Sequence, residues 1–382
     1  MQLWADFSLK RLFLPLFLPA ALVLTACSPN TKGKFSPFIY KSSSQTALPH
    51  DGNGGITVRV KLHAGEALQV KADDYTFTSG RVTRRGSGTL TLAEEGMLKP
   101  KGFFVLKSKR YFGALEAKRE GGGWLYVNHV PMDEYLTSVV SHEMSPSWHP
   151  EALKAQAVVA RTYLLVKMKE RTGKSFDVDT TTNFQVYGGV KKGDTGARNA
   201  VGETHDEVLY HGDSLAQTFF HSSCGGTLAS AQEVWGRPVP YLNVQNSPYC
   251  SNAPVYKWQV KIPFSEIARR LNARGIRNVT VAERSPSKRV KTLTIATASG
   301  VKKIRADKFR TALGAIKVKS TFFGIARKGD ALILTGRGFG HGVGMCQWGA
   351  KYQADERGNS YKRILDHYFP GTSLRRVAGY SV

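Results

Sequence analysis

Residues 141–165, which read SHEMSPSWHPEALKAQAVVARTYLL, decide the centre of the fold. Leu136, Val140 and Glu143 follow one another at i, i+4 and i+7, which places them on one face of a helix over 132–144. Pro150 begins a second helix, because proline is favoured in the first helical turn. Alanine and leucine form the inner stripe of this second helix and let a neighbouring element approach closely. We therefore expect the second helix to be central and buried.

The segments around these helices indicate an α+β fold. Residues 55–130 alternate apolar and polar side chains in short runs between glycine-containing turns, which predicts a β-rich N-terminal layer. This layer is expected to pack on a mixed catalytic core, residues 131–254, with a strand over 216–221. Residues 255–335 indicate a smaller, basic α/β lobe. The glycine-rich loop and C-terminal helix within 336–382 are expected to return to the core.

The chain is strongly basic. Its 382 residues include 54 lysines and arginines against 29 aspartates and glutamates, a net charge of +25. Such a balance gives affinity for polyanions. Nucleic acid, anionic lipid headgroups and the carboxylates of a cell-wall polymer all fit this charge, which does not choose among them.

Residues 1–26 have the pattern of a lipoprotein signal peptide. A basic start and a short apolar run lead to LTAC at 24–27, which resembles a bacterial lipobox. Cys27 would then receive the lipid, and residues 27–54 would form a flexible tether. The alternative is a plain cleaved signal with an incidental cysteine. Ser28 after the cysteine favours the outer membrane, so we expect a periplasmic, lipid-anchored protein with no nucleic-acid partner.

Three cysteines remain beyond the leader, Cys224, Cys250 and Cys346. Exported proteins can keep disulfides, and Cys224–Cys250 is the simplest pairing, which leaves Cys346 free. Zinc held by Cys224, Cys250 and His221 is the rival, and free thiols are the third alternative. The disulfide is favoured, so the sequence predicts no cofactor and no metal, with structural zinc as the less favoured possibility.

Glu143 is the candidate catalytic residue. Its helix face is otherwise aliphatic, and burial against apolar neighbours raises the pKa of a carboxyl group, which can then donate a proton near neutral pH. The alternative is a glutamate at a helix end that points to solvent or pairs with Arg161.

The second helix carries a polar cluster of Lys154, Gln156, Arg161 and Tyr163. These groups could bind sugar hydroxyls, N-acetyl groups or a lactyl carboxylate. The alternative for Arg161 is a buried structural ion-pair partner.

Two further stretches are candidates for substrate contacts. In TTTNFQVYGG, residues 180–189, an expected strand would place Gln185 and Tyr187 at a cleft. In HSSCGG, residues 221–226, glycines let backbone approach a ligand closely, and His221, Ser222 and Ser223 are the candidates.

A glycine-rich stretch, GRGFGHGVGMCQWGA at 336–350, supplies the last candidates. It lacks the Gly-Lys-Ser/Thr ending of a phosphate-binding loop. His341 between glycines is expected to be exposed on a tight loop. Gln347 and Trp348 are expected to begin the next helix, with Gln347 as a binding residue and Trp348 as a core anchor.

The most specific stretches are VPMDEYLTSVVSHEM followed by PSWHPEALKAQAVVARTYLL, QVYGG, HSSCGG with VWGRPVPYL, and GFGHGVGMCQWGA with HYFPGT. In this order they resemble the stage II sporulation protein D family, also called the SpoIID/LytB family. The resemblance covers about residues 55–375.

The resemblance implies an activity and partners. Family members characterised as enzymes are lytic transglycosylases, which cut the MurNAc-β-1,4-GlcNAc bond of peptidoglycan strands, preferably denuded ones, without water and leave 1,6-anhydroMurNAc ends. The resemblance also implies that Glu143 acts as acid and then as base. Other members are described as amidase enhancers, so the alternative is a non-catalytic peptidoglycan-binding partner of an N-acetylmuramoyl-L-alanine amidase. A third possibility is a polyanion-binding scaffold using residues 269–319.

Overall fold

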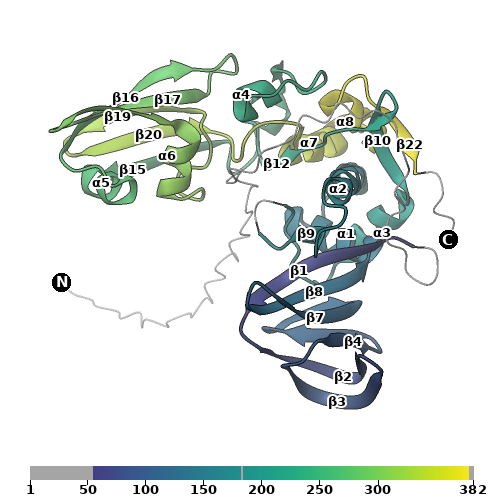
Figure 1. The fold of residues 1–382 in the computed structure, drawn as a ribbon. Helices are drawn as coiled ribbons and strands as arrows, with labels where there is room; N and C mark the ends of the chain where they lie inside the picture. The colour runs from purple at the N-terminus through teal and green to yellow at the C-terminus, as the bar shows by residue number, and fades with distance from the viewer. Residues whose placement is uncertain (1–54, 182–183, 378–382) are drawn as a thin grey trace, which may run out of the picture.

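The computed structural model describes residues 55–181 and 184–377. The expected signal peptide, the tether and Cys27 lie outside the described residues. Figure 1 shows three parts, which are an N-terminal sheet, a core built around α2, and a lobe formed by the segment from β15 to β20. Among the described residues, no helix combines the length and apolar character that a membrane crossing needs.

The N-terminal part is a sheet of nine strands within the described residues. Its path runs β6-β5-β2-β4-β7-β8-β1-β9, and β3 pairs with β2 beside that path. In β1, Val58 and Val60 are buried while their neighbours are partly exposed, as the alternation predicted. The expected β-rich layer is confirmed. The strands are β1 (Thr57–Gly65), β2 (Leu68–Ser79), β3 (Val82–Leu92), β4 (Gly96–Pro100), β5 (Phe103–Leu106), β6 (Lys109–Phe112), β7 (Ala114–Glu120), β8 (Gly123–Pro131) and β9 (Val178–Asp179).

The core is organised around one long buried helix. The two helices expected from the opening stretch are present as α1 (Met132–Glu143) and α2 (Pro150–Glu170). Alanines and valines on several faces of α2 are buried, which lets other helices pack closely around it. These are α1, α3 (Thr195–Glu203), α7 (Gln347–Arg357) and α8 (Tyr361–Tyr368).

Short strands connect the two ends of the core. β12 (Phe220–His221) lies parallel to β21 (Met345–Cys346), so the HSSCGG and GMCQW motifs are direct neighbours. The remaining short elements are β10 (Glu207–His211), β11 (Ser214–Leu215), β13 (Thr227–Leu228), α4 (Ala231–Trp235), β14 (Gln245–Asn246), the 3-10 helix η1 (Pro248–Cys250) and β22 (Ser373–Arg376).

Two expected strands are wrong or too long. Residues 184–190 have no regular structure, because backbone groups there bond to side chains and Gly189 has φ +79°. Of the strand expected over 216–221, only the last two residues pair. Both segments lie between packed elements that satisfy their backbone groups individually, which a periodic pattern does not reveal.

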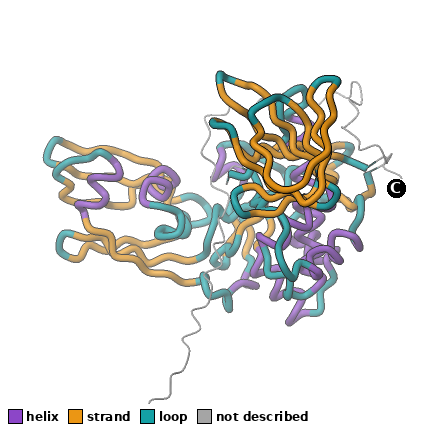
Figure 2. The backbone as a smooth tube through the Cα atoms, turned by 90° about the horizontal axis from the view of Figure 1, so that it is seen from below, coloured by secondary structure: helices purple, strands orange, loops and turns teal. Residues whose placement is uncertain are grey.

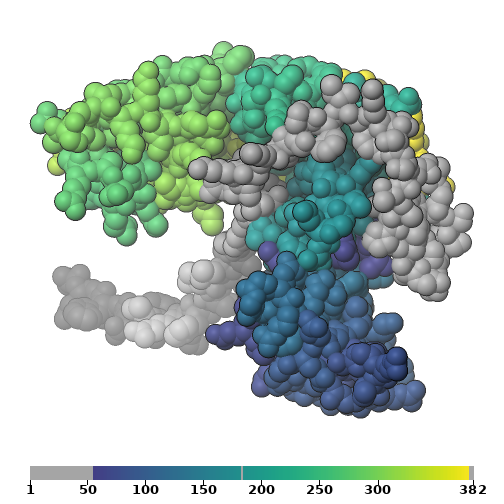
Figure 3. Space-filling model, in the orientation of Figure 1, coloured from purple at the N-terminus to yellow at the C-terminus, as the bar shows by residue number. Residues whose placement is uncertain are grey.

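The lobe has a hydrophobic core of its own. Two three-stranded sheets, β15-β20-β19 and β16-β17-β18, pack with two short helices. Figure 2 shows the lobe extending to one side, and Figure 3 shows it and the N-terminal sheet projecting in different directions from the core. Its elements are β15 (Lys257–Pro263), α5 (Phe264–Leu271), β16 (Ile276–Arg284), β17 (Val290–Thr297), β18 (Gly300–Arg305), α6 (Ala306–Leu313), β19 (Phe323–Lys328) and β20 (Ala331–Arg337).

Candidate active site around Glu143

Glu143 is the last residue of α1 and its side chain is buried, with the residue 4% exposed. The backbone N–H of Val186 donates to its Oε1 atom at 3.3 Å, and the Gln347 side-chain amide donates to Oε2 at 3.3 Å. One carboxyl group therefore joins the end of α1, the loop after β9 and the start of α7. The solvent-exposed alternative for this residue is wrong.

Burial raises the pKa of Glu143 to about 7, and the two hydrogen bonds from Val186 and Gln347 oppose this rise only in part. No charged group of the described chain is among the causes of this rise. At neutral pH, the protonated and ionised forms are therefore both well populated. A carboxyl group in this condition can give a proton and take one back.

The position of Gln347 depends on the pairing of β12 with β21. His221 lies opposite Cys346 in this pair, and the backbone N–H of Trp348 donates to the Ser222 carbonyl at 3.1 Å. Gly344 has φ +71°, and a Cβ atom there would lie 2.2 Å from the carbonyl oxygen of Phe219. Only glycine lets the loop turn this close to β12. The expected helix start at Gln347 is confirmed.

The histidines of the two motifs lie inside the core. The expectation that His341 is exposed is wrong, since it is 8% exposed and its ring centre lies 5.4 Å from that of His221. The tight loop folds inward, and the Val343 N–H donates to His341 Nδ1 at 3.1 Å. His221 donates from Nδ1 to the Val343 carbonyl at 3.1 Å. Burial, aided by the Arg289 cation, lowers the pKa of His221 to about 3 and keeps its ring neutral.

Ser222 and Ser223 follow His221 and are also buried. The Ser222 carbonyl is bound to the start of α7, because it accepts from the backbone N–H of Trp348. Ser223 exchanges two backbone hydrogen bonds with Phe339 at 2.7 and 3.0 Å. These contacts hold the HSSCGG turn against the glycine-rich loop.

Gln185 and Tyr187 flank the residue that donates to Glu143, but both side chains point into the interior. Gln185 donates to the Ala160 carbonyl at 3.3 Å. The Tyr187 hydroxyl donates to Asn128 Oδ1 at 2.7 Å. In the structure these side chains fix the loop that carries the Val186 N–H.

The polar side chains of α2 have different partners in the structure. Arg161 is fully buried and donates to the carbonyls of Val201, Thr204 and Glu207. It also lies 4.0 Å from a carboxylate oxygen of Asp133, which agrees with the alternative of a buried ion-pair partner. Lys154 forms ion pairs with two glutamates, at 2.9 and 2.6 Å.

Two residues of the same helix differ from these. The buried Gln156 amide has no hydrogen-bond partner within the described chain. Tyr163 makes an edge contact with Phe219, with 6.3 Å between ring centres. Within the described chain, the hydrogen bonds to the Glu143 carboxyl group come from Val186 and Gln347, which do not belong to α2.

The three cysteines converge in the core. The Sγ atoms of Cys224 and Cys250 are 3.3 Å apart, and the Cys224 N–H donates to Cys346 Sγ at 3.3 Å. All three are free cysteines in the structure. The separation exceeds the S–S bond length of about 2.05 Å, so the disulfide stays a prediction.

Comparison with known proteins gives a consistent result. A family model described as "Stage II sporulation protein" matches residues 120–211. Stage II sporulation protein D of Bacillus subtilis (strain 168) is 32% identical over 66% of this chain and 77% of its own length. An uncharacterized protein of Brachyspira hyodysenteriae is 36% identical over 71% of this chain and 74% of its own. The chain belongs to the SpoIID/LytB family.

Two further similarities concern this SpoIID/LytB protein. The amidase enhancer of Bacillus subtilis (strain 168) is 29% identical over 63% of this chain and 40% of its own length. A second model, described as "Domain of unknown function (DUF8618)", matches residues 231–344, which include the lobe. Residues 120–211, which match the stage II sporulation protein model, contain both α1 and α2, and with them Glu143.

Sequence reasoning missed three residues that lie near Glu143 or near the three cysteines. Val186 acts through a backbone N–H, for which a sequence carries no signal. Trp148 packs edge-on against Trp348 with 4.9 Å between ring centres, and its place in the opening stretch beside Glu143 was a usable signal. Arg289 reaches from the lobe to the Cys224 carbonyl at 2.8 Å, but it was hidden in a basic run.

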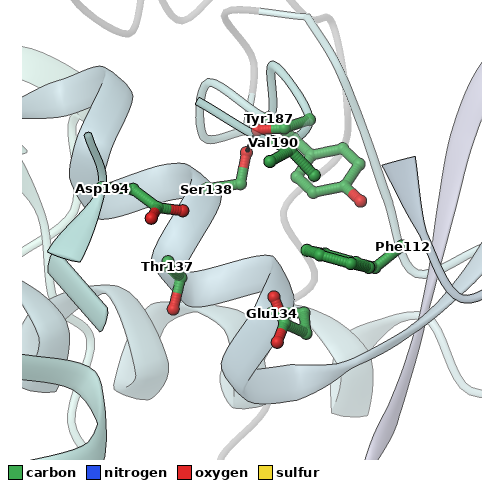
Figure 4. A pocket seen from close by; sticks show the side chains of 8 residues that line it. Phe112, Glu134, Thr137, Ser138, Tyr187, Val190 and Asp194 are labelled. Carbon is green, nitrogen blue, oxygen red and sulfur yellow. Dashed lines mark hydrogen bonds between the residues drawn. The ribbon is translucent and has the colours of Figure 1, made fainter. Parts of the chain in front are cut away.

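A small cavity lies beside α1 (Figure 4). Glu134, Thr137 and Ser138 line it from the helix, opposite Phe112 and Tyr187. Its volume of about 10 Å³ suits a single water molecule. Glu143 does not line it, so this cavity is not the place for a sugar.

Proposed function

We propose that this SpoIID/LytB protein is a lytic transglycosylase of peptidoglycan in which Glu143 acts as acid and then as base. The observation that carries the proposal is the buried Glu143 carboxyl group with its pKa raised to about 7. Ordinary glycoside hydrolases use two carboxylates, one of which activates water or attacks the sugar. A lytic transglycosylase needs only one, because the substrate supplies its own nucleophile.

In the proposed reaction, protonated Glu143 donates to the glycosidic oxygen as the bond to C1 of the muramic acid breaks. The resulting carboxylate then takes the proton of the C6 hydroxyl while that oxygen bonds to C1. The products are a free GlcNAc end and a 1,6-anhydroMurNAc end, and the enzyme returns to its starting protonation. The hydrogen bonds from Val186 and Gln347 stabilise the carboxylate between the two proton transfers.

The family relationship supports a role connected with peptidoglycan. Of the predicted binding residues, Gln347 donates to Glu143, and the carbonyl of Ser222 accepts from the backbone N–H of Trp348, the residue after Gln347. We propose these two as the groups that meet the glycan beside the scissile bond. Denuded strands are the proposed preferred substrate.

The test is a product analysis. Purified protein is incubated with denuded glycan strands and with intact sacculi, and the fragments are identified by mass spectrometry. We expect ends that are lighter by one water molecule than the ends a hydrolase leaves. Fragments carrying the added water would overturn the transglycosylase assignment.

A second candidate function rests on the similarity to the amidase enhancer. In this case the protein binds peptidoglycan and stimulates a separate amidase without cutting glycan. The same incubation distinguishes the two functions, because an enhancer alone releases no glycan fragments. Adding a purified amidase would then increase release of stem peptides, and this increase would not require Glu143.

We also propose that the mature protein is held at the periplasmic face of the outer membrane by lipid on Cys27. The LTAC pattern at 24–27 supports this. Cells labelled with palmitate should yield labelled protein, and the Cys27→Ala variant should carry no label. Equal labelling of both would contradict the anchor.

A further inference from the structure

A pocket opens on the lobe between the end of α5 and the turn that joins β17 to β18. Residues 272–274 form one wall, and residues 297 and 299–302 form the other. Its volume of about 290 Å³ compares with about 10 Å³ for the cavity beside α1. Because ligand pockets begin at about 300 Å³, this one suits a small group that projects from a larger molecule. All of its lining residues belong to the lobe, and none to the core that holds Glu143.

The backbone joins the two walls of this pocket to each other. Asn272 ends α5 in the left-handed region, with φ +49°, and its N–H donates to the Ala268 carbonyl. The chain then turns, and the Gly275 carbonyl accepts from the Ala298 N–H at 2.9 Å. Gly275 has φ +63°, and a Cβ atom there would lie 3.0 Å from the Ala298 side chain. The pocket is therefore formed by the fold itself, as small-molecule sites usually are.

Two cations of the pocket are free to bind an anion. Arg274 lies on one wall and Lys302 on the other, and no aspartate or glutamate lines the pocket. Within the described chain neither of them forms an ion pair, whereas Arg305 and Lys317 of the same lobe are paired with carboxylates. An arginine fork binds a carboxylate through two parallel hydrogen bonds, and a lysine adds a point charge. One carboxylate can therefore be held from both walls.

Neighbouring lysines of β18 lie on opposite faces of the sheet. Lys302 lies opposite Ile295 in the pairing of β18 with β17, and Ile295 is buried. Lys303 lies opposite Thr294, on the other face, because side chains alternate along a strand. Both lysines are exposed, but only Lys302 lines the pocket. Two adjacent residues with the same charge therefore differ in their access to it.

The remaining polar groups of the pocket suit a sugar beside the carboxylate. The Thr297 hydroxyl donates to the Gly300 carbonyl at 2.9 Å and lies 3.1 Å from the Ser299 hydroxyl. Lone pairs of these two oxygens are left to accept from a ligand hydroxyl. The Asn272 side-chain amide makes no hydrogen bond within the described chain, and an amide can both donate and accept. The pocket therefore matches an anion that carries hydroxyl or amide groups.

We propose that this lobe pocket binds the lactyl carboxylate of a muramic acid residue whose stem peptide has been removed. In an intact strand this carboxyl group is bonded to the peptide as an amide, so only denuded strands present it as an anion. The inference rests on the proposed function, because it takes peptidoglycan as the polymer. The lobe would hold a denuded strand through this pocket while the core, from which the lobe projects (Figure 3), cuts the strand at Glu143. A preference for denuded glycan would then come from a site outside the catalytic core.

The test measures binding and needs no cleavage. The purified full-length protein is titrated in a calorimeter with N-acetylmuramic acid and with N-acetylglucosamine, the same sugar without the lactyl group. We expect N-acetylmuramic acid to bind at least about tenfold more tightly. Arg274→Gln and Lys302→Gln should each weaken its binding about tenfold, because each removes one charged partner of the carboxylate. Lys303→Gln is the matched control and should bind like the wild type.

Equal binding of the two sugars, or an equal loss in Lys303→Gln, would overturn the proposal. Two further probes are titrated, N-acetyl-D-alanyl-D-alanine and inorganic phosphate. Tighter binding of the dipeptide would assign the pocket to the end of a stem peptide, and tighter binding of phosphate would assign it to a phosphate group, so either result overturns the proposal as well. If the pocket failed this test while anhydro ends still formed, the proposed function would stand, so the two failures are distinguishable.

Discussion

At the scale of single residues, the unusual feature is the raised pKa of one buried carboxyl group, that of Glu143. Glu143 is buried at the end of α1, and its two hydrogen bonds are the modest ones from Val186 and Gln347 at 3.3 Å. These bonds are too weak to offset burial fully, so the pKa stays near 7. A stronger donor or a nearby cation would lower the pKa and hold the group ionised.

Glu143→Gln should change how stability depends on pH. The folded-state pKa of Glu143 lies above its unfolded value of 4.5, so the wild type loses stability as pH rises through about 7. The loss amounts to about 3 kcal/mol between pH 5 and pH 9, because a pKa difference of one between the folded and unfolded states corresponds to about 1.4 kcal/mol. The glutamine variant should lack this loss. Urea unfolding at both pH values measures it, and parallel pH curves for the two proteins would contradict the burial argument.

At the scale of elements, the start of α7 is placed by a tight loop and a two-residue strand pair. β12 and β21 are short, but they bring Gln347 to the carboxyl group at the end of α1. The loop before β21 has room only for glycine where it passes Phe219. The site therefore depends on a few backbone positions as much as on polar side chains.

Gln347→Leu should move the pH profile of cleavage. The Gln347 amide favours the ionised form of Glu143, so its loss raises the pKa of that carboxyl group further. The alkaline limb of kcat/KM, which reports the pKa of the acid, should move to higher pH. Gln353→Leu, the same change farther along α7, should leave the limb in place. If the alkaline limb of Gln347→Leu stayed where it is in the wild type, Gln347 would not influence the pKa of Glu143.

Gly344→Ala should destabilise the fold by more than about 2 kcal/mol, because a positive φ and a close carbonyl act together. Gly358 is the matched control. It also has a positive φ, +60°, but a Cβ atom there meets nothing within 4 Å. Gly358→Ala should cost only about 1 kcal/mol. Equal losses in thermal or urea unfolding would show that crowding at Phe219 is unimportant.

At the scale of the whole molecule, the charge is concentrated in one part. Residues 255–335 contain 19 lysines and arginines against four acidic residues, a net charge of +15 out of +25 for the chain. The lobe projects from the core (Figure 3) and has its own hydrophobic core. Under the proposed function, we therefore expect the lobe to be the part that holds an anionic polymer.

Replacing exposed cations of the lobe by neutral residues should weaken binding to sacculi at low salt. The difference in binding between this variant and the wild type should vanish at high salt, because exposed charges are screened. A pull-down with purified sacculi at two ionic strengths measures the bound fraction. The four exposed cations to change to glutamine are Arg270, Arg274, Lys302 and Lys303.

The matched control removes four exposed cations from the N-terminal sheet instead. The residues are Lys71, Arg81, Arg85 and Lys101. Because the net charge falls by the same amount, an effect of total charge alone would appear in both variants. Equal weakening in the two would contradict a specific role of the lobe.

Much of this architecture could be predicted from periodicity. The apolar spacing around Leu136 and Val140 and the proline at 150 place α1 and α2 correctly, and Glu143 with them. The same method fails for residues 184–190, whose backbone bonds to side chains of other elements. It also fails for His341, because glycine-rich loops indicate exposure unless a tertiary partner buries them.

The convergence of distant residues could not be predicted. Cys346 and Cys224 are 122 residues apart, and only the β12–β21 pairing brings their side chains together. Arg289 belongs to a run of basic residues that is otherwise largely exposed, and its burial depends on how the lobe meets the core. Local patterns carry no information about such contacts.

The most direct test of Glu143 as the acid and base is the rate at which 1,6-anhydro ends appear from denuded glycan. The wild type is compared with Glu143→Gln and with Glu134→Gln, the same change on the same helix at a residue paired with Arg198. We expect Glu143→Gln to lose roughly 10²–10⁴-fold of the rate, while Glu134→Gln stays near the wild type. A folded Glu143→Gln protein that releases anhydro ends at the wild-type rate would contradict the central claim.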